Sequence, residues 1–271
     1  MKAKKIVALV AAAAMVLSMA ACGSTDNSSS DAKDGSAAAE TTKTSDSDTL
    51  VMATNATFPP YEYVDGEEYK GIDIEIAQAI ADAMGKKLEV DDIDFDSIIP
   101  AITTGKADMS LAGMTVTDER KENVDFSDSY ATGVQVIIPE DSDITGPDDL
   151  ANDKMIGVQQ GTTGHIYCSD TPKNGGFGED HVTAYPNGAS AIQALQTGKV
   201  DAVVIDNEPA KAFVAENPGL KILDTEYVTE DYAIAVKKGN TELLDQINET
   251  LAKLKADGTL QSIIDKYIKA E

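Results

Sequence analysis

The chain has 271 residues, 42% of them hydrophobic, which is enough for one large domain or two modest ones with a buried core. Its formal net charge is −25, and the resulting field repels polyanions, which argues against nucleic acid and anionic lipid as partners. A solvated acidic surface explains the charge more simply than a cationic substrate does.

Residues 1–21 have the pattern of a secretory signal peptide. Three lysines precede an apolar run from Ile6 to Leu17, which is too short to span a bilayer comfortably. Residues 18–23, SMAACG, resemble the bacterial lipobox, in which Cys22 is lipidated and becomes the mature N-terminus; Met19 stands where Leu is commoner. The alternative is an ordinary secretory signal that ends near a cysteine. Cleavage removes the three lysines and makes the charge −28.

The segment 22–48 is predicted to be a lipid-anchored, disordered tether. Residues 23–48 contain no aromatic and no large aliphatic residue, and such a coil spans roughly 30 Å. With Cys22 lipidated, Cys168 has no cysteine to pair with. No catalytic histidine pattern accompanies Cys168, so we interpret it as a passive thiol.

From Leu50 onward, short β-like segments alternate with amphipathic helical segments, which predicts α/β units around mostly parallel sheets. In chain order we expect a strand at 50–53, a helix at 74–84, a helix from 96 with Pro100 in its first turn, and strands at 108–112, 155–158 and 202–205.

A partial repeat indicates two lobes of like construction. Residues 101–108, AITTGKAD, recur 93 residues later as 194–201, ALQTGKVD, and each copy reads as helix, glycine cap, then strand. A generic helix-to-strand connection can produce the same likeness by chance. If there are two lobes, the loops at the carboxyl ends of their strands should line a cleft between them.

Arg120 is one candidate binding residue of that cleft. It comes just after a strand end, behind Thr117 as a plausible helix N-cap. Its planar guanidinium fits a carboxylate in a bidentate pair. The alternative is a surface salt bridge with Asp118 or Glu122.

Asp206 is the second charged candidate. It ends the apolar strand 202–205, so its buried carboxylate calls for a cation such as a ligand ammonium. It can also serve as the N-cap of a helix that starts near Asn207, and both roles are compatible.

The run Gly161-Thr162-Thr163-Gly164 precedes a predicted helix, so its N–H groups and hydroxyls can bind an anion. It lacks the lysine and the spacing of a phosphate loop, so a carboxylate fits better than a nucleotide. Phe58, Tyr61 and Phe95 follow strand ends and can wall a pocket, although each taken singly is as compatible with the core.

Together these stretches resemble the polar amino-acid-binding proteins of ABC importers, the bacterial extracellular solute-binding protein family 3. That family contains the glutamine-, histidine- and lysine/arginine/ornithine-binding proteins. The resemblance covers Thr49 to Glu271. The segments that carry it are TNATFPPYE (54–62), GIDIE (71–75), FDSIIPAI (95–102), AGMTVTDER (112–120), VQQGTT (158–163) and DAVVID (201–206).

The resemblance implies roles for the site residues. Arg120, Thr115, Thr162 and Thr163 would hold the α-carboxylate of an amino acid, Asp206 and the Gly113 carbonyl its α-ammonium, and Phe58 with Phe95 its side chain. Asn55, Tyr61, Met114 and Gln159 complete the expected ligand-binding set. Asn55 stands where members that bind glutamine or basic amino acids often carry Asp, which weakens a preference for cationic side chains without excluding it.

The fold that the resemblance implies is α/β and two-lobed, like a periplasmic binding protein, with a mostly parallel sheet flanked by helices in each lobe. Lobe 1 would comprise 50–135 plus 231–271, and lobe 2 the inserted residues 136–230. Two crossing segments, Val134–Ile138 and Asp231–Val236, would form the hinge.

The expected function is that of an extracytoplasmic, monomeric substrate-binding lipoprotein. It would pass a free polar amino acid to the permease subunits of an ABC importer, touch the cell membrane only through the lipid on Cys22, and use no cofactor or metal. One alternative is a sensory module that reports occupancy to a receptor. The other is a dehydratase-type enzyme on the same fold; because neither His165 nor His181 lies in a catalytic motif, we predict no catalytic residues.

Overall fold

The computed structural model describes residues 48–130, 134–224, 227–228 and 230–268, and the structural statements below refer to these residues. The predicted signal peptide, Cys22 and nearly all of the predicted tether lie outside them. Within the described part of the chain, no helix is long and apolar enough to cross a membrane.

The first sheet has five strands in the order β5-β1-β6-β13-β7. β1 pairs in parallel with β5 and β6, whereas β13 pairs antiparallel with β6 and β7. Four of the five strands therefore run in one direction. Their bounds are β1 Thr49–Thr54, β5 Lys87–Asp92, β6 Met109–Ser110, β7 Val124–Phe126 and β13 Ala235–Lys237.

The second sheet repeats this plan in the order β10-β9-β11-β8-β12. β9 pairs in parallel with β10 and β11, and β8 is the antiparallel strand, paired with β11 and β12. The bounds are β8 Val134–Pro139, β9 Ile156–Gln159, β10 Val182–Tyr185, β11 Ala202–Asp206 and β12 Leu220–Ile222.

The expectation of two α/β lobes is confirmed, but both sheets are mixed. β8 and β13 are the strands that the chain enters directly after leaving the other sheet, and each runs against its neighbours. Periodicity along the sequence cannot reveal this reversal, because a strand buried in a sheet looks the same in either direction. The exact lobe boundaries stay predictions.

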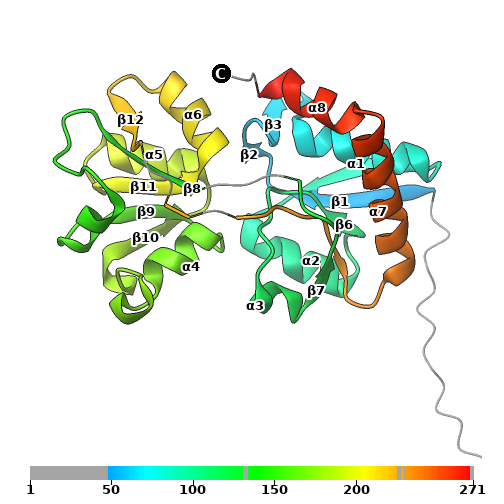
Figure 1. The fold of residues 1–271 in the computed structure, drawn as a ribbon, viewed down its shortest axis with the longest axis horizontal. Helices are drawn as coiled ribbons and strands as arrows, with labels where there is room; N and C mark the ends of the chain where they lie inside the picture. The colour runs from blue at the N-terminus through cyan, green and yellow to red at the C-terminus, as the bar shows by residue number, and fades with distance from the viewer. Residues whose placement is uncertain (1–47, 131–133, 225–226, 229, 269–271) are drawn as a thin grey trace, which may run out of the picture. The chain divides into compact units, whose positions relative to one another are not determined.

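Helices flank each sheet (Figure 1). Over the first sheet, three helices contact one another, α1, α7 and α8, and α2 packs on β1 and β13. In the second sheet, α5 packs on β9 and β11, and α6 packs on β8 and β12. The bounds are α1 Ile72–Ala83, α2 Ile98–Thr104, α3 Asp118–Lys121, α4 Thr163–Ser169, α5 Gly188–Gln196, α6 Asn207–Glu216, α7 Thr241–Ala256 and α8 Thr259–Tyr267. A small sheet, β2 Thr57–Phe58, β3 Glu62–Asp65 and β4 Glu68–Lys70, follows β1.

α1 starts at a glycine for a steric reason. Gly71 has φ +128°, and a Cβ built on it would lie 2.1 Å from the carbonyl oxygen of Tyr61. Only glycine allows the loop that holds Tyr61 to approach the helix so closely. Along the helix, three isoleucines one turn apart are fully buried against the sheet, as an amphipathic face requires.

The partial repeat corresponds to two structurally equivalent turns. Gly105 and Gly198 both have left-handed φ, 74° and 68°. In the first copy, Oδ2 of Asp108 accepts a hydrogen bond of 2.9 Å from the N–H of Val51; in the second, Oδ2 of Asp201 accepts one of 2.7 Å from the N–H of Met155. Each aspartate thus fixes the neighbouring strand of its own sheet.

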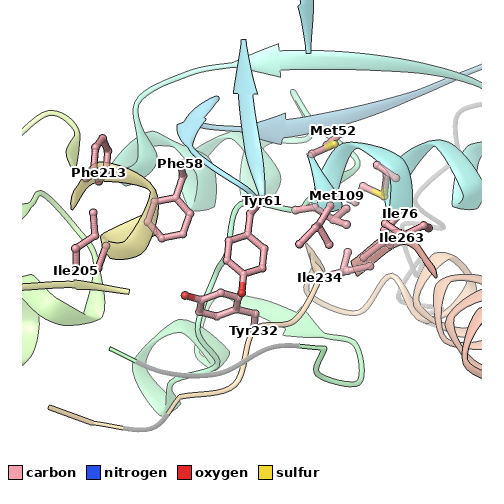
Figure 2. Close-up of a cluster of buried hydrophobic side chains, with 14 of the residues drawn as sticks. Met52, Phe58, Tyr61, Ile76, Met109, Ile205, Phe213, Tyr232, Ile234 and Ile263 are labelled. Atoms are coloured by element: carbon pink, nitrogen blue, oxygen red, sulfur yellow. The ribbon is translucent and has the colours of Figure 1, made fainter. Parts of the chain in front are cut away.

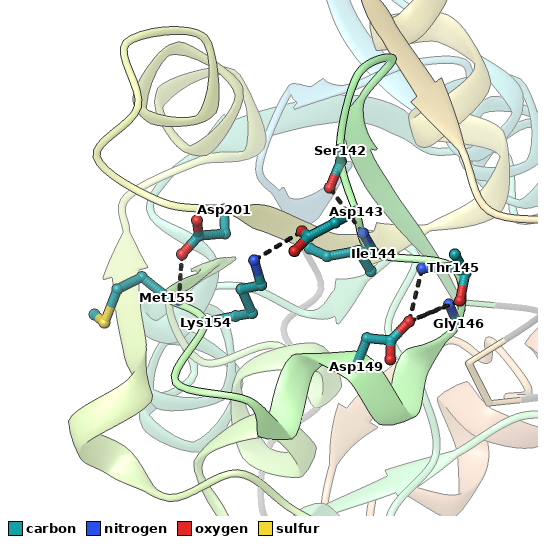
Figure 3. Close-up of polar contacts among 9 residues, drawn as sticks. All are labelled: Ser142, Asp143, Ile144, Thr145, Gly146, Asp149, Lys154, Met155 and Asp201. Carbon is teal, nitrogen blue, oxygen red and sulfur yellow. Dashed lines mark hydrogen bonds and ion pairs between the residues drawn. The ribbon is translucent and has the colours of Figure 1, made fainter.

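The connection between β8 and β9 is held by short polar contacts (Figure 3). Oδ2 of Asp149 accepts hydrogen bonds from the N–H groups of Thr145 at 2.8 Å and Gly146 at 3.2 Å. Lys154 Nζ lies 2.8 Å from Oδ1 of Asp143. These contacts order a stretch that has few apolar residues of its own.

The two segments that cross between the sheets are hydrogen-bonded to each other. The N–H of Tyr130 donates to the carbonyl of Tyr232 at 2.9 Å, and the N–H of Ser127 donates to Ile234 at 2.9 Å. Val134–Ile138, predicted as one hinge segment, belongs to β8 and pairs within the second sheet. The last two residues of the other predicted segment, Asp231–Val236, belong likewise to β13 of the first sheet.

Candidate functional site

A pocket lies among the loops that follow strands of both sheets. Its volume is about 310 Å³, counting the part open to solvent. The residues that line it are Asn55, Phe58, Glu62, Phe95, Ala112, Gly113, Thr115, Arg120, Gln159, Thr162, Thr163 and Asp206. Ten of the twelve residues predicted to bind ligand are therefore gathered at one place.

Arg120 is buried at the pocket, with 5% of its surface exposed. Thr117 caps α3 by accepting from the N–H of Arg120 at 3.1 Å, which sets the start of the short helix that carries the arginine. Nη1 donates to the carbonyl of Thr115 at 2.6 Å, and Nη2 donates to the carbonyl of Gly161 at 3.0 Å. The guanidinium therefore joins residues attached to both sheets.

The environment of Arg120 favours an anionic ligand. Its guanidinium carbon lies 5.5 Å from the centre of the Phe95 ring, a cation–π distance. Burial lowers the pKa of Arg120, so the negative charge around the guanidinium does not fully offset the cost of burying it. The alternative of a surface salt bridge with Asp118 or Glu122 is not what the structure shows, because the guanidinium is buried and donates to the carbonyls of Thr115 and Gly161.

Asp206 ends β11 and is 8% exposed. Burial raises the pKa of its carboxyl from the ordinary 3.8 to about 7, while the neighbouring Tyr232 and the charge of Arg120 act in the opposite direction. It occupies the N-cap position of α6, but its side chain makes no capping hydrogen bond. The carboxylate is therefore left for another partner, and a cation in the pocket would supply it.

Gly113 has a backbone that a side chain would disrupt. Its φ is +52°, and a Cβ would lie 2.8 Å from a ring carbon of Phe58. Its N–H donates to Oδ2 of Asp73 at 2.9 Å, and the Tyr130 hydroxyl donates to the same oxygen at 2.8 Å. With the N–H engaged in this way, the carbonyl of Gly113 is its only backbone group left for a ligand.

Glu62 lines the pocket and was missed by the sequence reasoning. It is 1% exposed, and burial raises the pKa of its carboxyl well above the usual range, with the charge of Asp73 and a hydrogen bond to Asp73 adding to the effect. Burial also raises the pKa of Asp73, to about 6. Burial and the neighbouring charge of Asp73 thus both favour the protonated form of Glu62.

Two of the predicted residues do not line the pocket. Tyr61 is 3% exposed and packs edge-on against Tyr232, with ring centres 5.3 Å apart (Figure 2). Met114 is fully buried in a core cluster with Phe95. In both cases the next residue along the chain, Glu62 or Thr115, lines the pocket instead.

Polar side chains join the loops of the two sheets beside the pocket. Nε2 of Gln159 donates to Oδ1 of Asn55 at 3.0 Å, and Nδ2 of Asn55 donates to the carbonyl of Ile93 at 3.0 Å. Nε2 of Gln160 donates to Oδ2 of Asp96 at 2.6 Å. Both the oxygen and the nitrogen of the Asn55 side-chain amide are thus hydrogen-bonded.

A second carboxylate that the sequence reasoning missed is Glu230. It is 5% exposed, and its Oε2 accepts hydrogen bonds from the hydroxyls of Thr115 and Thr163, both at 2.8 Å. These partners lie 115 and 67 residues away along the chain, so no local pattern marks Glu230.

Other candidate reactive groups lie apart from the pocket. Neither His165 nor His181 lines it, and Cys168 is a buried free thiol whose pKa burial raises to about 12. Among the described residues, no three His, Cys, Asp or Glu side chains are placed to hold a metal ion.

Comparison with known proteins gives consistent results. Residues 50–270 match the bacterial extracellular solute-binding proteins, family 3. The arginine-binding extracellular protein ArtP of Bacillus subtilis (strain 168) is 31% identical over 272 residues, which cover 99% of each chain. An ancestral arginine-binding protein solved with arginine is 43% identical over 82% of this chain and 98% of its own, with a TM-score of 0.76. An ancestral arginine-binding protein solved with glutamine is 42% identical over 82% and 99%, with a TM-score of 0.75.

Proposed function

Because this chain belongs to the bacterial extracellular solute-binding proteins, family 3, we propose that it captures a polar amino acid in the pocket and delivers it to the permease of an ABC importer. One observation carries the proposal. A buried guanidinium and a buried carboxylate, Arg120 and Asp206, line the same small pocket, and each lacks full charge compensation. A zwitterion satisfies both at once.

The proposed roles follow from the positions of the groups. Arg120 binds the ligand carboxylate, assisted by the N-terminal residues Thr162 and Thr163 of α4. Asp206 and the Gly113 carbonyl bind the ammonium. Phe58 and Phe95 form apolar walls on which an aliphatic or planar side chain can lie. Because the binding groups come from both sheets, the ligand stabilises the arrangement in which the two lobes are together.

Arginine and glutamine are the first side chains to test. Both have been seen in structures of ancestral arginine-binding proteins that resemble this chain. The Glu62 carboxyl and the amides of Asn55 and Gln159 line the pocket as hydrogen-bonding groups, which suit either a guanidinium or an amide side chain. We therefore propose a polar amino acid and leave the choice between these two to measurement.

Attachment to the membrane is proposed to occur through a lipid on Cys22, which lies outside the described residues. The lipobox-like sequence supports this proposal, and so does the extracellular family to which the chain belongs. Mass spectrometry of the protein from its own membranes would show a diacylated Cys22. An unmodified, secreted chain would contradict the proposal.

The test of function is calorimetric titration of the mature chain with the common amino acids. At least one should bind with a micromolar dissociation constant, about −8 kcal/mol, and Arg120→Ala should abolish that binding. Lys121→Ala is the matched control, because it removes an exposed cation one residue away. Failure of every amino acid to bind would refute the proposal. Purification with a receptor instead of a permease would favour a sensory role.

A further inference from the structure

We propose that Glu230, which lies beside the pocket, occupies the hydroxyls of Thr115 and Thr163 and competes with the carboxylate of the ligand for them. This inference rests on the proposed function, because it concerns the same site. In this inference Glu230 lowers the affinity for the ligand, whereas the other residues of the site raise it.

The first argument is the count of hydrogen-bond donors. Each threonine hydroxyl has a single proton to donate. The hydroxyls of Thr115 and Thr163, which both line the pocket, donate that proton to the same oxygen of Glu230 at 2.8 Å. While Glu230 stays in place, neither hydroxyl can donate to a ligand carboxylate.

The second argument is charge. The negative charge of Glu230 acts on Arg120, raising its pKa against the lowering effect of burial, and on Asp206, adding to the rise that burial causes. Burial raises the pKa of Tyr167 to about 12, and the charge of Glu230 and a hydrogen bond to it add to that rise. Tyr232 is affected by the same charge. The charge of Glu230 therefore acts on the same guanidinium that is proposed to bind the ligand carboxylate.

The third argument is the way Glu230 is attached. The next residue, Asp231, accepts a hydrogen bond of 3.0 Å from the N–H of Val116, and Tyr232 forms a bridge with Thr115. The backbone beside Glu230 is thus fixed to the first sheet's side of the pocket. Its carboxylate meanwhile bonds to Thr163, which begins α4 beside the second sheet. In the absence of ligand, Glu230 holds together the same two groups that a bound carboxylate would join.

A function in delivery follows from this arrangement. An amino acid must displace Glu230 from the threonine hydroxyls, so part of its binding free energy is offset. When the ligand leaves, Glu230 can return and satisfy the two hydroxyls and Arg120 at once. A protein that must release its ligand to a permease benefits from an affinity limited in this way.

The test compares Glu230→Gln with the parent chain, using arginine and its decarboxylated form agmatine as probes. The substitution keeps the size of the side chain and removes the charge. Arginine should bind at least about tenfold more tightly to the variant, a typical value for a charged hydrogen-bond partner. Agmatine lacks the carboxylate that competes with Glu230, so its affinity should change by less than about twofold. Glutamine and its decarboxylated form replace this pair if the chain prefers glutamine.

Two further variants complete the test. Asp231→Asn removes an equal charge at the adjacent, exposed position and should leave both affinities unchanged. If Glu230→Gln does not fold, Glu230→Asp keeps the charge, shortens the reach to the hydroxyls, and should still tighten arginine binding by a smaller factor.

Equal or weaker binding of arginine by Glu230→Gln would overturn the inference, because it would mean that Glu230 orients the threonines for the ligand. An equal gain for arginine and agmatine would overturn it as well, because the effect would then not depend on the carboxylate. If no variant and no parent chain binds any amino acid, it is the proposed function that fails.

Discussion

Replacing Asp206 with asparagine should have opposite effects on stability and on binding. The aspartate ends β11 beneath the pocket, 8% exposed, where its charge is poorly compensated in the absence of ligand. Asparagine has nearly the same shape and no charge. The unliganded protein should therefore become more stable while ligand binding is lost.

The size of the stability change follows from the pKa. Burial raises the pKa of Asp206 from 3.8 to about 7. A group whose pKa is higher in the folded state binds more protons when folded, so its ionisation destabilises the fold as pH rises from about 4 to about 7. A shift of about three pKa units corresponds to about 4 kcal/mol of unfolding free energy lost at pH values above that window. This is an upper limit, because opening of the lobes lets water reach the carboxylate.

The effect on binding has the opposite sign. Removing one partner from a buried charge pair costs about 2–5 kcal/mol, so the amino acid should bind at least roughly 30-fold more weakly. The assay is thermal unfolding of both proteins between about pH 5 and pH 8, with and without the amino acid. Without ligand, the variant should gain stability over the parent as pH rises; with ligand, only the parent should be stabilised further. A variant that is less stable than the parent by the same amount at every pH would refute the reasoning.

Three other changes test separate parts of the structure. Glu62→Gln should gain stability relative to the parent as pH rises from about 5 to 8, because it removes a carboxyl whose pKa is raised in the folded state. Denaturant titrations measure the difference in stability between the two proteins, and a difference that does not vary with pH would contradict the coupling of Glu62 with Asp73. Gly113→Ala should weaken amino acid binding and cost about 1–2 kcal/mol of unfolding free energy, because the φ of Gly113 is +52° and the new methyl group meets Phe58. Calorimetry that finds the binding affinity and the unfolding free energy unchanged would refute this prediction. Asp108→Asn and Asp201→Asn should each destabilise the protein by a similar amount, about 1–2 kcal/mol in urea unfolding, because each aspartate fixes a neighbouring strand. If only one of the two variants lost stability, the two turns would not be equivalent.

The sequence by itself determined the features that depend on neighbouring residues. Residues a few positions apart set the cap at Thr117, the left-handed glycines of the two repeated turns, and the positions of Arg120 and Asp206 next to the ends of elements. The end of a strand was less certain: the strand expected at 108–112 is Met109–Ser110 in the structure. The resemblance to a family then supplied the two-lobed fold, because the same motifs in the same order are specific to it.

Only the tertiary structure decided which side chains meet. Tyr61 and Met114 were expected in the pocket, but their neighbours Glu62 and Thr115 line it instead, and a shift of one residue cannot be read without knowing where the sheet lies. The direction of β8 and β13 depends on where the chain crosses between the sheets. Glu230 meets its two threonines across 115 and 67 residues, and a contact at that distance arises from packing alone, since no local conformational preference reaches so far along a chain.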